Sequence, residues 1–266
     1  MSQDIAERDR TVMLELEEVS ISFHTGGNSY DHGVHHVLDR VSMRVYEGET
    51  VGIMGRNGVG KTTMLRIMAG ILAPTAGKIT IAAGKTASLL SLGLGFRPEL
   101  TGRSNALLAA MLQGSTRAQA EAFVPEILEF SELGDSFDLP VQNYSAGMRA
   151  RLGFTTALMT HVDILLVDEV LSVGDAHFRG KALAAMRERI SSDQTVVFVS
   201  HMADHIKTLC DRVIWLDEGK IAQQGEPKEV VNAYQAYITS SRESGVEQQT
   251  KKIEAKKQVQ PNDESQ

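Results

Sequence analysis

The sequence predicts an α/β protein whose parallel sheet carries an inserted helical lobe. Short apolar strands and one helix are expected before about residue 90, and strands alternate with helices after residue 160. The stretch between them, roughly 101–160, changes character and is typical of helices alone. An apolar strand over Thr50–Met54 ends at a glycine-rich loop, and a helix follows at once.

The elements before the lobe are mostly strands. Apolar and polar residues alternate from Val12 to Phe23, which is the period of a half-buried strand, with a slip at Glu17–Glu18. The alternation returns over Val41–Val45. The other elements expected here are a helix over 61–69, a turn over Pro74–Gly77, and strands over Lys78–Ile81 and Thr86–Leu90.

The lobe and the second half of the core follow. Thr116 and Gln119 have the spacing of a capping box at a helix start, and Pro125 should break that helix. The lobe helices are expected over Ala106–Gln113, Thr116–Phe130 and Ala146–Thr160. After them we expect strands over Ile164–Val167, Val196–Ser200 and Val213–Leu216, helices over Ala176–Ile190 and Pro227–Ser240, and a hairpin turn over Asp217–Lys220.

Composition restricts the class of protein. The 266 residues are 42% hydrophobic, as in globular proteins, and the single cysteine, Cys210, indicates a reducing compartment and hence the cytoplasm. With 5% aromatic residues and a net charge of −7, a carbohydrate-stacking face and a nucleic-acid partner are poor fits. We expect no secretory signal and no membrane span. We expect a polar extension over 1–11, one domain over 12–240 and a solvated tail over 241–266.

A phosphate-binding loop is the most specific motif, because residues 55–62 fit G-x-x-x-x-G-K-[ST] between a strand and a helix. Glycines let backbone N–H groups surround a pyrophosphate, and the helix start adds its positive dipole end. Lys61 should reach the β- and γ-phosphates of ATP, and Thr62 should bind Mg²⁺. A glycine-rich turn that merely matches the pattern is the alternative. The residues expected at the nucleotide are Gly55, Arg56, Asn57, Gly58, Val59, Gly60, Lys61, Thr62 and Thr63.

Two further motifs favour the same chemistry. Asp168 and Glu169 end an apolar strand, which is costly unless they emerge at a site. Asp168 is expected to hold Mg²⁺ and Glu169 to polarise the attacking water, although acids at a strand end can also simply face solvent. Tyr144–Met148 presents a serine hydroxyl and free N–H groups at a helix start, a second anion site, although a lone S-A-G is usually an ordinary N-cap.

Together these motifs resemble the nucleotide-binding domain of ABC transporters over about residues 12–240. The family's signature loop reads L-S-G-G-Q where this chain has Tyr144, Ser145, Ala146, Gly147 and Met148. The resemblance implies a P-loop NTPase core of RecA type, with an antiparallel β subdomain and a helical subdomain at about 101–160. It also implies ATP hydrolysis by a head-to-tail homodimer, in which the signature loop of one copy closes the ATP site of the other.

Three more residues match family positions. Asp175 ends a stretch that looks like the D-loop, and His201 matches the switch histidine that contacts the γ-phosphate, so that His201 joins Glu169 and Lys61 as a catalytic residue. Phe23 is similar to the aromatic residue that stacks on adenine, although packing in the core is the alternative.

Within that superfamily the chain is most similar to the ATPases of polysaccharide exporters of capsule, O-antigen or teichoic acid type. The segments Leu100–Asn105, Leu133–Arg149 and Val167–Asp175 carry this resemblance, and Ser104 departs from the glutamate usual in T-G-R-E-N. It implies a peripheral subunit on the cytoplasmic face of the inner membrane, docked on a separate polytopic permease. The rivals are the ATPase of a lipid or drug exporter, a soluble ABC protein acting on DNA or the ribosome, and a nucleotide kinase.

Two loops depart from simple expectation. ABC ATPases usually place a glutamine after the strand that ends here near Leu90, and residues 91–99 contain none. We expect water to take that place beside Mg²⁺, with Phe96 and Arg97 serving as the docking surface for the membrane partner. The segment 24–36 holds four histidines, for which zinc is one interpretation and a surface loop the favoured one.

Overall fold

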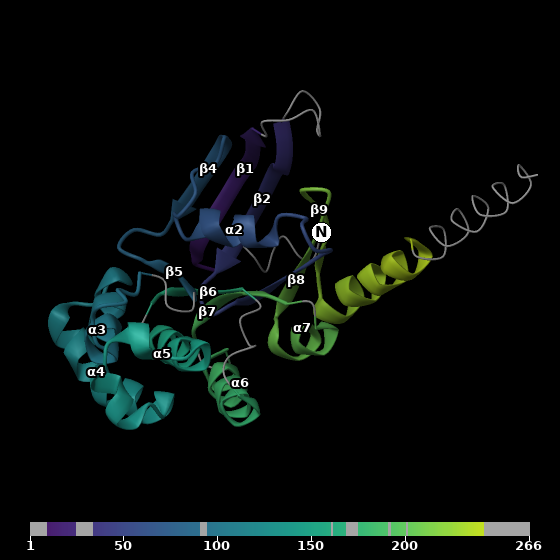
Figure 1. Ribbon diagram of the computed structural model, residues 1–266. Helices are drawn as coiled ribbons and strands as arrows, with labels where there is room; N and C mark the ends of the chain where they lie inside the picture. The colour runs from purple at the N-terminus through teal and green to yellow at the C-terminus, as the bar shows by residue number, and fades with distance from the viewer. Residues whose placement is uncertain are drawn as a thin grey trace, which may run out of the picture.

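The structure is a computed structural model that describes residues 10–24, 34–90, 95–160, 162–168, 175–190, 193–200 and 202–241. Figure 1 shows a body built from two sheets with helix α2 between them, and a lobe of helices α3 to α5 beside it. Most of the expected polar extension and tail, as well as Glu169 and His201, lie outside the described residues.

The smaller sheet is antiparallel, in the order β2-β1-β4. Its strands are β1 (Val12–His24), β2 (Val34–Tyr46) and β4 (Ala76–Ile81). The expected slip in β1 is confirmed, because the register shifts between Leu16 and Val19 and Glu18 has a positive φ of 49°. Both strands reach further into the histidine segment than the alternation predicts, since Phe23 pairs with His35.

The larger sheet has the order β5-β6-β7-β3-β8-β9. Its strands are β5 (Ala87–Leu90), β6 (Ile164–Asp168), β7 (Thr195–Val199), β3 (Thr50–Met54), β8 (Arg212–Asp217) and β9 (Lys220–Gly225). Only the β8–β9 pair is antiparallel. Its hairpin turn is confirmed, with positive φ at both Glu218 and Gly219, as a two-residue type I′ turn requires.

Helices cover the larger sheet and form the lobe. They are α2 (Lys61–Met68), α3 (Gly102–Leu112), α4 (Arg117–Ser131), α5 (Ala146–Met159), α6 (Ala176–Ile190) and α7 (Ala203–Leu209), together with a helix over residues 227–241. Within the described residues no helix is both long and apolar enough to cross a membrane.

Helix α4 confirms one prediction and corrects another. The capping box between Thr116 and Gln119 is present in full. The expectation that Pro125 breaks the helix is wrong, because α4 continues through it to Ser131. Pro125 lies on the exposed face of the helix. The carbonyl that loses its partner, that of Glu121, can therefore bond to water.

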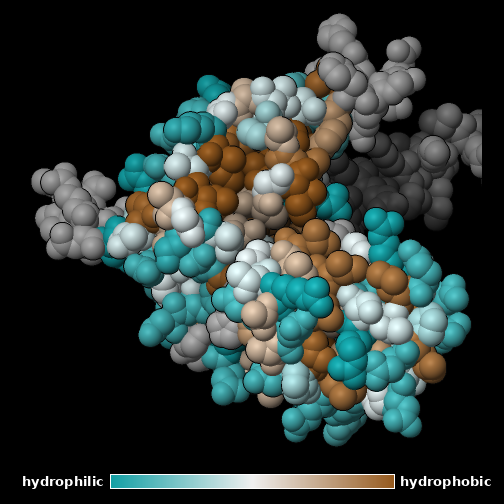
Figure 2. All heavy atoms as spheres, turned by 90° about the vertical axis from the view of Figure 1, so that its left-hand side faces the viewer, coloured by the Kyte–Doolittle hydropathy of each residue, from teal (hydrophilic) through white to brown (hydrophobic). Residues whose placement is uncertain are grey.

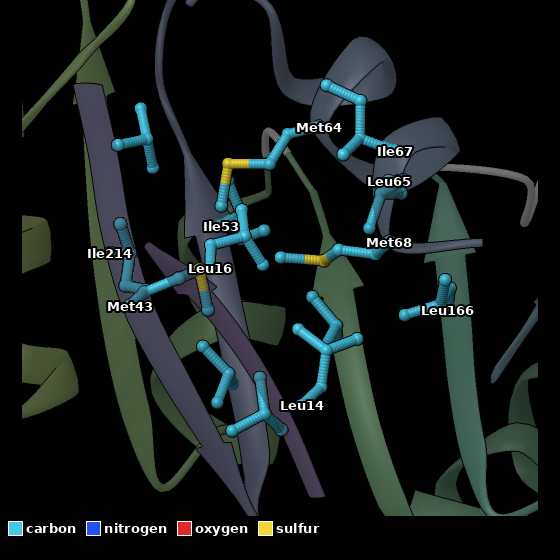
Figure 3. Packing of buried hydrophobic residues seen from close by; sticks show 14 of the residues in the cluster. Leu14, Leu16, Met43, Ile53, Met64, Leu65, Ile67, Met68, Leu166 and Ile214 are labelled. Atoms are coloured by element: carbon cyan, nitrogen blue, oxygen red, sulfur yellow. The ribbon is translucent and has the colours of Figure 1, made fainter. Parts of the chain in front are cut away.

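A core cluster between the two sheets holds α2 in place. Figure 3 shows Met64 and Met68 of α2 reaching toward Ile53 on β3 and Leu16 on β1, and all four side chains are almost fully buried. Burying each such side chain contributes about 1.5–3 kcal/mol. The loop that precedes α2 is thereby anchored at its helical end.

Candidate active site

The order of the strands brings three segments of the chain to one edge of the larger sheet, the edge formed by the carboxyl ends of its parallel strands. Val199 of β7 pairs with Ile53 of β3 on one side and with Asp168 of β6 on the other. Adjacent strands lie about 4.8 Å apart, so β3 and β6 are separated by only about 10 Å. The glycine-rich loop after β3, Asp168 and the chain after β7 therefore meet at the carboxyl ends of the parallel strands.

Glycine gives the loop its path. Gly55, Gly58 and Gly60 all have positive φ, at 153°, 82° and 105°. A Cβ on Gly55 would lie 2.2 Å from the carbonyl oxygen of Leu216, and one on Gly60 would lie 2.9 Å from that of Val37. The loop is thus wedged between β8 and β2, which fixes the position of its backbone N–H groups.

The start of α2 is free to bind an anion. Gly60 occupies the N-cap position without a side-chain hydrogen bond, and the first turn contains no acidic residue. The first N–H groups of a helix have no partner within the helix, and the helix dipole adds positive potential there. The half-buried Thr62 and Thr63 lie in this first turn. The geometry fits a phosphate group.

Lys61 places a cation at the loop. Its Nζ donates hydrogen bonds to the carbonyl oxygens of Gly55 and Arg56, at 2.8 and 2.9 Å, and the residue is only 8% exposed. Burial lowers the pKa of Lys61, while the nearby negative charge of Asp168 acts in the opposite direction. The ammonium group is held by neutral acceptors that an anionic phosphate can replace.

The donor set at this edge fits Mg²⁺. The Thr62 hydroxyl and the Asp168 carboxylate are hard oxygen ligands, and both residues are partly exposed. Ser200, the first residue after β7, is buried, and its Oγ accepts a hydrogen bond from the backbone N–H of Met202 at 3.1 Å.

The predicted signature loop lies at the start of α5 in the lobe. Ser145 is the N-cap, and its Oγ accepts a hydrogen bond from the backbone N–H of Met148 at 3.2 Å. Ser145 and Ala146 are exposed and Gly147 is half-buried, whereas Tyr144 is 4% exposed. The loop presents its hydroxyl and N–H groups outward while its tyrosine is anchored.

The predicted D-loop residue Asp175 contacts the signature helix. Its carboxylate accepts a hydrogen bond from the backbone N–H of Phe178 at 3.0 Å and pairs with the guanidinium of Arg151 on α5. These contacts lower the pKa of Asp175, the Phe178 hydrogen bond most. At the other end of both helices, Arg189 of α6 donates to the carbonyls of Leu158 and Thr160. Helices α5 and α6 are therefore joined at both ends.

The alternatives left open for Phe23 and for the histidines of segment 24–36 can be compared with the structure. Phe23 is 41% exposed at the end of β1, which excludes packing in the core. His35 and His36 lie in β2, and His36 Nδ1 is 2.8 Å from Ser22 Oγ. The described residues hold no group of three side chains suited to a metal ion. His32 and the side chain of His24 lie outside them.

No sequence motif predicts a role at the site for Arg151 or for two residues of the lobe, Gly102 and Asn105. The only signal for Gly102 and Asn105 is their place in T-G-R-S-N, which indicates similarity to the exporter family and not a chemical role.

The fold and the strand-end site define a phosphate-loop nucleotide-binding protein with a helical lobe. The family model described as ABC transporter matches residues 38–172, and the chain belongs to the ABC transporter family. Its curated relatives include the teichoic acids export ATP-binding protein TagH of Listeria innocua, 42% identical over 76% of this chain and 59% of the relative. Another is the O-antigen export system ATP-binding protein RfbB of Klebsiella pneumoniae, 42% identical over 74% of this chain and 80% of the relative.

The match to some relatives is partial, since this chain spans less than two thirds of the length of the Listeria protein. Among solved structures, the dimeric ATP-binding cassette MJ0796 in a post-hydrolysis state bound to ADP and Pi has a TM-score of 0.67. It is 24% identical, and the match covers 81% of this chain and 99% of that one. This likeness shows the fold.

Proposed function

We propose that this chain is the ATP-hydrolysing subunit of an ABC transporter that exports a cell-surface polysaccharide of capsule, O-antigen or teichoic acid type. One observation supports ATP hydrolysis most directly: the phosphate loop, buried Lys61 and Asp168 lie together at the carboxyl ends of the parallel strands. The choice of cargo is supported by relatives named for teichoic acid and O-antigen export.

Each site residue has one task in the proposed reaction. Lys61 and the N–H groups at the start of α2 bind the β- and γ-phosphates, and Thr62 and Asp168 hold Mg²⁺, which neutralises phosphate charge when bound. Glu169 orients and polarises the attacking water, and His201 contacts the γ-phosphate. Their predicted places follow the strands β6 and β7, whose described ends lie at this edge.

A second copy of the chain completes the site. The exposed hydroxyl and N–H groups at Ser145–Gly147 suit the γ-phosphate of ATP bound by the other copy. The named cassette of similar fold is dimeric, which supports a homodimer. A monomer is therefore expected to bind ATP and to hydrolyse it poorly.

The membrane partner is a separate polytopic permease, docked at the cytoplasmic face of the inner membrane. Phe96 and Arg97 form the proposed docking surface. Figure 2 shows the face of the molecule that is at the left of Figure 1, where apolar side chains gather in an upper and a lower group. The exposed large apolar residues include Ile71, Leu108, Met111 and Leu112. Such patches mark protein contacts.

Complementation in cells tests the proposal. In a strain that lacks this gene, wild-type protein and Arg66→Ala, a control on the exposed side of α2, should restore the surface polysaccharide. Lys61→Ala at equal protein level should not, and lipid-linked polysaccharide should accumulate inside the cell. Normal surface polysaccharide in the deletion strain, with loss of a lipid or drug export phenotype instead, would favour the rival cargo.

A further inference from the structure

The segment that contains Phe96 and Arg97 is hydrogen-bonded to the segment that precedes the signature loop. The two run antiparallel, and Thr101 and Pro140 form a β-bridge between them. The hydrogen bonds are Gln142 N to Pro98 O at 2.8 Å, Val141 N to Leu100 O at 3.0 Å and Gly102 N to Leu139 O at 3.2 Å. Main-chain bonds of this kind hold two segments in register and leave little freedom for either to move alone.

Asn105 ties the same segment to α3. Its side chain is 1% exposed, and its Nδ2 donates to the carbonyl oxygens of Arg97, Leu100 and Thr101 at 3.0–3.1 Å. Its Oδ1 accepts from the backbone N–H of Arg97 at 2.7 Å. Both ends of one amide are thus used, and the four hydrogen bonds bind three residues next to the proposed docking surface.

Gly102 contacts the residue next to the signature serine. A Cβ on Gly102 would lie 2.2 Å from the hydroxyl of Tyr144 and 2.9 Å from the carbonyl oxygen of Phe137. The Tyr144 hydroxyl donates to the carbonyl oxygen of Ser136 at 2.6 Å. Only glycine leaves room for this ring, and the ring in turn fixes the backbone immediately before Ser145.

From these contacts we infer that Gly102 and Asn105 are positioning residues that make residues 97–105 and the signature loop one rigid unit. The inference rests on the proposed function, in which a permease displaces Phe96 and Arg97 and Ser145 acts on ATP bound by a second copy. The displacement then reaches the second copy's ATP through the lobe. This route does not use a glutamine beside Mg²⁺, which residues 91–99 lack.

Hydrogen exchange on the nucleotide-free protein tests the rigid unit without relying on ATP. Gly102→Ala should speed exchange at the Val141, Gln142 and Met148 amides by at least about tenfold, since local opening sets these rates. Adding Tyr144→Phe removes the hydroxyl that the new methyl meets and should restore part of the protection. Gly180→Ala is the control, because a Cβ there meets nothing within 4 Å.

Asn105→Asp provides a second test that does not add volume. The carboxylate keeps an acceptor for the Arg97 N–H and loses all three donations, so the Met148 amide should again exchange faster. Exchange at Met148 within twofold of wild type in both Gly102→Ala and Asn105→Asp would overturn the inference. Failure of Tyr144→Phe to restore any protection would remove the role given to the Gly102–Tyr144 contact.

A third test measures ATP-dependent dimerisation in protein that also carries Glu169→Gln, in the presence of Mg-ATP. Gly102→Ala should weaken ATP-dependent dimerisation at least about tenfold while the ATP affinity of the monomer stays unchanged, because the signature loop acts across the dimer. Full dimerisation in this variant would contradict the inference. If Glu169→Gln alone does not dimerise, the proposed dimeric ATPase is at fault, and the exchange experiment still decides the inference.

Discussion

Two glycines of the phosphate loop make a matched pair for testing the structure of the site. Gly55 and Gly58 both have positive φ, but their surroundings differ. A Cβ on Gly55 would lie 2.2 Å from the backbone carbonyl oxygen of Leu216, whereas one on Gly58 would meet nothing within 4 Å. Replacing each by alanine therefore separates backbone strain from steric overlap.

The expected magnitudes follow from these contacts. At Gly58 alanine costs only the left-handed conformation, about 1–2 kcal/mol. At Gly55 the conformation itself is almost restricted to glycine, at about 1–3 kcal/mol, and the overlap with β8 adds about 1–3 kcal/mol. We expect Gly55→Ala to cost about 4 kcal/mol, which lowers the melting temperature by about 12 °C, against about 5 °C for Gly58→Ala.

Urea unfolding and thermal melts of the purified variants measure this difference. The free energy of unfolding should fall for both variants and by clearly more for Gly55→Ala. Equal losses would mean that Leu216 does not confine the loop. A Gly55→Ala protein within about 0.5 kcal/mol of wild type would refute the placement of the loop against β8.

Three other changes test the site, the helix pair and the docking surface. Lys61→Ala should weaken ATP binding at least about tenfold in calorimetry, since a charge-assisted contact is lost; unchanged affinity would argue against the phosphate-loop assignment. Arg151→Ala and Asp175→Ala should each destabilise the protein, and the double variant should lose less than the sum; full additivity would mean that the pair does not interact. Phe96→Ala with Arg97→Ala should spare the basal ATPase of the subunit and abolish export; loss of Mg-dependent hydrolysis in folded protein would place this loop in the active site.

The local sequence pattern predicted those strands and helices whose structure is determined by their own residues. Alternation over Val12–Phe23 identified β1 and even its slip, because one buried face imposes a period of two. The helix over Ala176–Ile190 has the predicted bounds. The phosphate loop was recognisable because its function requires glycines and a lysine at fixed spacing.

Contacts between distant residues could not be predicted in this way. Pro125 stays within α4 because its face of the helix is exposed, which depends on how α4 packs in the lobe. Gly102 lies against Tyr144, 42 positions further along the chain, and Arg151 of α5 pairs with Asp175, which directly precedes α6. None of these partners follows from spacing, since the fold alone brings them together.

In the proposed mechanism two copies of this chain close on ATP before hydrolysing it. Size-exclusion chromatography of Glu169→Gln with Mg-ATP tests it most directly, because removing the water-polarising carboxylate should leave ATP binding intact and stop turnover. We predict that this variant moves from the monomer to the dimer position with Mg-ATP and not with Mg-ADP. A variant that stays monomeric with ATP bound, or that hydrolyses ATP at the wild-type rate, would contradict it.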